Sequence, residues 1–181
     1  MKKTGMLRIA EYVDAVAQKE PVPGGGSVNG VFGATAAGLM LMVLAYSENN
    51  KNCAAHKHEL FSARKFFEPM KDKFLMLSDA DIKAYGAYAA GDKEKAAVAM
   101  TQVPFEMAEL AYAAVAVIRS LKGKTNKYLE TDRAIAEKTF MSIFDTSSMN
   151  VSGNISQIAD AKAKEKFEIN IEALTRSYRS L

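Results

Sequence analysis

The chain has 181 residues, 49% of them hydrophobic, and a net charge of +3, which fits a single domain over residues 1–181 with a core of its own. Acidic and basic residues alternate through most of it, a pattern that argues against nucleic-acid binding, and the single Cys53 excludes a disulfide framework and a cysteine metal site. The charged, amphipathic N-terminus is unlike a secretory signal, and a lone thiol is typical of the cytoplasm, where we expect the protein.

The first predicted element is an amphipathic helix over residues 8–19, which stops before Pro21 because a residue preceding proline resists helical geometry. A helix without any charge follows over residues 28–46. Its length meets the criterion for a membrane span. Several glycines and alanines, the polar Asn29 and Thr35, and the lack of a second such segment favour a core or subunit-interface helix that is buried all round. We therefore expect no membrane association.

Between these two helices lies the segment PVPGGGS, residues 21–27. A glycine loop that opens into a helix presents free backbone N–H groups to an anion, and no Cβ keeps a ligand away from it. Gly24, Gly25, Gly26 and Ser27 are therefore candidate binding residues. The alternative is that the glycines only form a turn after Pro23 and that Ser27 is an ordinary helix N-cap.

The remaining elements are also predicted to be helices. They cover residues 52–90, where Pro69 kinks or divides the helix; 92–102, with Asp92 as N-cap; 103–121, with Pro104 in the first turn; 130–144; and a terminal segment with apolar residues at heptad spacing. No strand is predicted. The sequence thus indicates an all-α bundle or array of about six to seven helices without significant sheet. Its apolar surface favours a homodimer.

Two acidic residues are candidates for catalysis. Asp81 lies on the apolar stripe of its helix, and a buried carboxylate must be paired or have a shifted pKa. Asp132 lies at a predicted helix start, where a desolvated carboxyl can be tuned as a general acid or base. The alternatives are a capping or helix-pairing role for Asp81 and a capping role for Asp132.

Asn150 and Asn154 are candidate binding residues, because amides four apart on a helix face the same way. Each offers two donors and one acceptor, which suits a heterocycle with a mixed hydrogen-bonding edge. The alternative is a helix start capped by Ser147 or Ser148.

Five segments, taken in order, resemble the cyclodeaminase/cyclohydrolase family of folate enzymes: PVPGGGSVNG, DADIKAY, VPFEMAELA, TDRAIAEK and NVSGN. The resemblance implies an all-α homodimer that acts on a tetrahydrofolate carrying a one-carbon unit. As a cyclodeaminase it would convert 5-formiminotetrahydrofolate to 5,10-methenyltetrahydrofolate and ammonia. As a cyclohydrolase it would interconvert the methenyl compound and 10-formyltetrahydrofolate. A third alternative is a non-catalytic folate-binding or scaffolding protein.

On this resemblance we assign Asp132 as the acid/base and Asp81 as an orienting or second acid, with no metal or redox cofactor. Residues 24–27 would hold a pterin carbonyl or a carboxylate of the glutamate tail, and Asn150 and Asn154 the pterin edge. The sequence departs from the family pattern at three places. Thr131 replaces a serine, Arg133 replaces a small residue, and Thr146–Ser147 replaces a Gly-Ala pair, which bears on the shape of the pocket.

Overall fold

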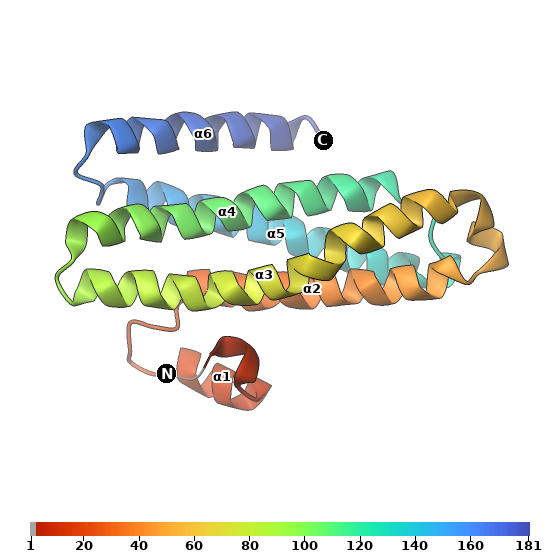
Figure 1. Cartoon of the computed structure of the whole chain (residues 1–181), viewed down its shortest axis with the longest axis horizontal. Helices are drawn as coiled ribbons and strands as arrows, with labels where there is room; N and C mark the ends of the chain where they lie inside the picture. Colours follow the sequence, from red (N-terminus) through yellow and green to blue (C-terminus); the bar gives the residue numbers. More distant parts are fainter. Residues whose placement is uncertain (1–2) are drawn as a thin grey trace.

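The computed structural model describes residues 3–181, and within them every regular element is a helix. Four long helices form an antiparallel bundle: α2 (Gly25–Glu48), α3 (Lys57–Ala89), α4 (Lys93–Ser120) and α5 (Glu130–Ile155). Helix α2 packs against α3 and α5, and α4 packs against the same two helices (Figure 1). This confirms the predicted all-α architecture.

Two shorter helices flank the bundle on opposite sides. Helix α1 (Ile9–Val16) lies beside α2 and α3, whereas α6 (Ala161–Arg179) packs along α4 and α5 (Figure 1). Short 3₁₀ turns at Thr4–Met6, Lys51–His56 and Lys127–Leu129 precede α1, α3 and α5. The arrangement leaves a groove between α2 and α5 uncovered.

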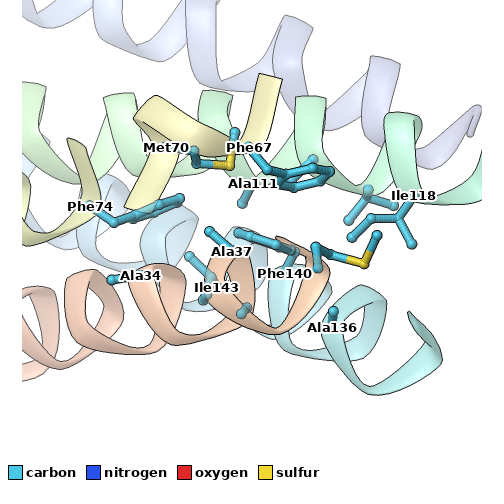
Figure 2. Packing of buried hydrophobic residues seen from close by; sticks show 14 of the residues in the cluster. Ala34, Ala37, Phe67, Met70, Phe74, Ala111, Ile118, Ala136, Phe140 and Ile143 are labelled. Carbon is cyan, nitrogen blue, oxygen red and sulfur yellow. The ribbon is translucent and has the colours of Figure 1, made fainter. Parts of the chain in front are cut away.

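The core combines large side chains with small ones. The rings of Phe67 and Phe74 of α3 lie 6.1 Å and 5.9 Å from the ring of Phe140 of α5 (Figure 2). On α2 the facing positions are small: Ala34 and Ala37 are buried, and a Cβ on Gly33 would overlap the Phe74 ring. The recurrence of small residues in the uncharged helix therefore lets α2 pack closely on α3.

Helix α2 begins earlier than predicted, and it is not buried all round. Its N-cap is Gly24, so Ser27 lies inside the first turn and is not the cap. Phe32 and Tyr46 are exposed, because neighbouring helices cover only part of its circumference. Among residues 3–181 it is the one helix long and apolar enough to cross a bilayer, and half of its most apolar window is buried in the bundle.

Two predicted helix boundaries were wrong. Helix α4 continues through Pro104, which we expected to start a new helix, and α5 continues past residue 144 to Ile155, so Ser147 and Ser148 do not cap a helix. The Ser148 hydroxyl donates to the Phe144 carbonyl of the preceding turn at 2.8 Å, a bond that lets serine remain within a helix. Pro69 also lies inside α3, which changes direction along its length without dividing (Figure 1).

Candidate functional site

The groove between α2 and α5 has a volume of about 840 Å³, within the usual range for a small-molecule site. Its walls are largely apolar. The polar residues among them are Asn29 on α2 and, on α5, Thr131, Lys138, Thr139, Ser142, Thr146 and Asn150. Of the binding residues predicted from the sequence, Gly25 and Asn150 line this groove.

The first turn of α2 meets Asp81 of α3. A Cβ on Gly26 would overlap the Asp81 carboxylate, whereas a Cβ on Gly25 would meet nothing within 4 Å. The Asp81 carboxylate can therefore pack against the first turn of α2 only because residue 26 is glycine. Because residue 25 is also glycine, no side chain from that position fills the groove. Burial raises the pKa of the Asp81 carboxyl, and the backbone N–H of Ser27 opposes that shift. The protein's own carboxyl thus occupies part of the anion-binding position predicted for the glycine loop.

The Ser27 side chain is fully buried and belongs to a row of hydroxyl groups. Its Oγ lies 2.9 Å from the Tyr12 hydroxyl of α1 and 2.8 Å from Ser78 Oγ of α3. Ser78 Oγ donates to Thr4 Oγ1 at 3.3 Å, and the Thr4 hydroxyl and backbone N–H both donate to Asp79 Oδ1, at 2.6 Å and 2.7 Å. The Ser27 side chain therefore braces the start of α2 and does not point into the groove.

Asn29 is a groove residue that the sequence analysis did not select. Its Nδ2 donates to Ser147 Oγ at 3.2 Å, and its Oδ1 accepts from Thr146 Oγ1 at 3.0 Å. The two α5 partners are the pair that replaces the Gly-Ala of the family pattern. An amide within an otherwise uncharged run was the available signal, since a buried amide needs polar partners on the helix that it faces.

The two predicted asparagines have different surroundings in the structure. Asn150 lines the groove, but Asn154 Nδ2 donates to the Met100 carbonyl of α4 at 2.7 Å. Met100 lies four residues before Pro104, so its carbonyl has no N–H to accept from within α4. Asn154 supplies the missing donor. Asn154, predicted to bind the pterin edge, does not line the groove, and its Nδ2 joins α5 to α4.

Neither Asp132 nor Asp81 lines the groove, and the two acids lie beside its opposite ends. Asp132 is half-buried in the first turn of α5, and the adjacent Thr131 lines the groove. Asn150 is 18 residues further along the same helix (150 − 132), which corresponds to about 27 Å. Because Asn29 bonds near the Asn150 end, the start of α2 and Asp81 are also at that end. One copy of the chain therefore does not bring the two acids to one carbon atom.

Arg133 points away from the groove. It is 3% exposed and donates to Glu130 at 2.7 Å, to Glu137 at 3.1 Å and to the Ile118 carbonyl at 3.3 Å. Arg119 of α4 also donates to Glu137, at 2.8 Å. The substitution of a small family residue by Arg133 therefore strengthens the contact between α4 and α5 and leaves the groove lining unchanged. Within residues 3–181, no cluster of three or more His, Cys, Asp or Glu side chains is arranged to hold a metal ion.

The fold and this site define an all-helical bundle with a ligand-sized groove between α2 and α5 and a half-buried acid of α3 that meets the first turn of α2. The family model of formiminotransferase-cyclodeaminase matches residues 8–173, and the chain belongs to that family. Its fold is similar to the crystal structure of formiminotetrahydrofolate cyclodeaminase from Thermotoga maritima, with a TM-score of 0.91 and 23% identity over 97% of this chain and 92% of that one. No curated protein matches.

Proposed function

We propose that the protein is a formiminotetrahydrofolate cyclodeaminase, which converts 5-formiminotetrahydrofolate to 5,10-methenyltetrahydrofolate and ammonia. The observation that carries this proposal is the half-buried Asp81 carboxyl, which packs against Gly26 with a raised pKa beside a groove of substrate size. Family membership and the likeness to the Thermotoga maritima enzyme support the same activity.

The chemistry needs one proton donor and one acceptor. N10 attacks the carbon of the protonated formimino group, so that a new C–N bond forms, the C=N double bond becomes a single bond, and N10 loses its proton. The bond to the departing nitrogen then breaks, and that nitrogen must be protonated to leave as ammonia. Asp81 suits the donor, since a raised pKa keeps the proton on a carboxyl at a pH where an exposed aspartate has lost it. Asp132 is then suited to the role of proton acceptor. This proposal reverses the assignment from the sequence, in which Asp132 was the main acid/base and Asp81 an orienting or second acid.

Polar groups along the groove suit a folate. Asn150, and Asn29 through the oxygen and nitrogen of its amide, offer donors and acceptors for the mixed edge of a pterin. Lys138 lies further along the same wall and carries a positive charge suited to a carboxylate of the glutamate tail. The open Cβ position of Gly25 gives the ring room to approach the first turn of α2.

We further propose that the active form is a homodimer. Phe32, Ile135 and Met149 line the groove and are 55%, 51% and 71% exposed, an apolar surface suited to a second copy. A two-fold axis across the middle of the groove, perpendicular to the helices, would bring Asp132 of the second copy to the end that carries Asp81. Each active site would then contain one acid from each chain.

The decisive experiment measures ammonia release from 5-formiminotetrahydrofolate together with the near-ultraviolet absorbance of the methenyl product. We expect both to rise together with purified protein. Hydrolysis of the methenyl compound without ammonia release would instead identify a cyclohydrolase. No acceleration of either reaction, with folate still bound, would identify a non-catalytic folate-binding protein.

No metal or redox cofactor is needed for this chemistry, because each step moves only protons and an amine. We therefore expect turnover to be unchanged after dialysis against a chelator. A loss of activity that added divalent cations restore would contradict this part of the proposal.

A further inference from the structure

The direction of hydrogen bonding along the buried row of hydroxyls is set by its last member. The Asp79 carboxylate only accepts, so the Thr4 hydroxyl donates to it. A hydroxyl has one proton, and the Ser78 hydroxyl donates its proton to Thr4. Ser27 must then donate to Ser78, and Tyr12 must donate to Ser27. The row is therefore polarised from Tyr12 to Asp79 over four hydrogen bonds.

The middle of this row coincides with the contact that holds Asp81. Ser27 follows Gly26, whose missing Cβ admits the Asp81 carboxylate, and the Ser27 backbone N–H faces the same carboxylate. Tyr12 is the one buried residue of α1, and its hydroxyl proton is committed to Ser27. The Tyr12 hydroxyl consequently does not donate to Asp81.

We propose that the hydroxyl row from Tyr12 to Asp79 positions the first turn of α2 against Asp81, which makes Tyr12, Thr4 and Asp79 positioning residues of the active site. This inference rests on the proposed function of Asp81 as a proton donor. It goes beyond that function because it assigns a role to the N-terminal segment, from Thr4 to α1, which does not line the groove.

The ionisable surroundings of Asp81 are simple enough to test this role. Helix α1 brings Tyr12, and the first two turns of α2 carry no ionisable side chain. On α3 itself, Asp79 and Lys83 each lie two residues from Asp81, and Tyr85 lies four residues after it. With the row intact, the Ser27 N–H lowers the pKa of Asp81, so loosening the turn removes that influence and raises this pKa further.

The test compares Thr4→Val, which removes a hydroxyl at constant shape, with Thr4→Ser, which keeps it. The pKa of Asp81 is read by carbon-13 NMR of its carboxyl group without any folate. We expect Thr4→Val to raise this pKa and Thr4→Ser to match the wild type. In turnover, Thr4→Val should lower kcat by about three- to tenfold, the effect of one net hydrogen bond, and change KM little. The basic limb of the kcat profile should move to higher pH.

An unchanged or lowered Asp81 pKa in Thr4→Val, with native circular dichroism, would overturn the proposal. If Thr4→Val does not fold, Tyr12→Phe gives the same readout at the other end of the row. The exposed Tyr128→Phe is its matched control and should leave the Asp81 titration unchanged. The titration requires no substrate. A wild type without turnover would therefore contradict the proposed function, while the titration would still decide whether the row positions Asp81.

Discussion

At the scale of single residues, Asn154 shows how one side chain lets a helix contain a proline. Pro104 lies inside α4 and is buried, yet the carbonyl four residues before it still accepts a hydrogen bond, from Asn154 Nδ2 at 2.7 Å. A buried carbonyl without a donor would cost free energy. Asn154 of α5 therefore provides the hydrogen-bond donor that the Met100 carbonyl of α4 lacks within its own helix.

Asn154→Ala is expected to lower the free energy of unfolding by about 1–3 kcal/mol, because it leaves the Met100 carbonyl unsatisfied. In a Pro104→Ala background the restored backbone N–H takes over that carbonyl, so the same substitution should cost much less. Urea unfolding of the four proteins of this double-mutant cycle measures the coupling. Equal costs in both backgrounds would show that the amide and the proline act independently.

Asp81→Asn separates catalysis from stability. The amide oxygen still accepts from the Ser27 N–H, but it cannot deliver a proton, so we expect kcat to fall by about 10²-fold or more. The folded-state pKa of Asp81 is raised, so its ionisation costs stability as pH rises from the unfolded to the folded pKa. Thermal melts should therefore find the variant equal to the wild type below the unfolded pKa and more stable at neutral pH. A variant less stable than the wild type at neutral pH would contradict the raised pKa.

At the scale of elements, the close contact between α2 and α3 depends on glycine at one position and tolerates a side chain at another. A Cβ on Gly30 would lie 2.7 Å from the Phe74 carbonyl oxygen and 2.9 Å from Ser78 Cα, which are backbone atoms that cannot move aside. A Cβ on Gly38 of the same helix would meet nothing within 4 Å. The two positions therefore form a matched pair.

Gly30→Ala should destabilise the protein by about 1–3 kcal/mol through overpacking. Gly38→Ala should stabilise it by about 0.5–1 kcal/mol, because alanine has the better helix propensity. Chemical denaturation measures both. If the two variants had the same stability, α2 and α3 would not approach each other closely at Gly30.

At the scale of the whole molecule, the positions of the two acids make the dimer testable. If each site takes Asp81 from one chain and Asp132 from the other, a heterodimer of Asp81→Asn and Asp132→Asn chains contains one doubly altered site and one intact site. Random mixing of the two inactive proteins should then restore about a quarter of wild-type activity, since half of the dimers are heterodimers with one intact site of two. Sites built within one chain would remain inactive after mixing.

The sequence predicted the helices well because their apolar periodicity is local information. The predicted helix boundaries near Pro104 and Ser147 were wrong. At these places the hydrogen-bond partners of the backbone are distant in sequence or lie within the same helix. Asn154 is 54 residues from Met100, and no pattern around Pro104 reveals it. Likewise, the sequence pattern selected Asp81 and the glycine loop, but only the fold reveals that Gly26 admits that acid. The separation of Asp132 from Asp81 also depends on α5 being one unbroken helix.

The order of packing around the bundle has a consequence for folding. The contacts of α2 with α3 and of α4 with α5 join consecutive helices, so each pair can form as a hairpin at low entropic cost. The contact of α2 with α5 joins distant parts of the chain and includes the polar pair of Asn29 with Ser147. The segment just before α5 adds a bond from the Asn126 backbone N–H to Ser47 Oγ at the end of α2. The groove lies on this seam between the hairpins. A ligand bound there would bridge both hairpins and slow amide hydrogen exchange in α2 and α5 together.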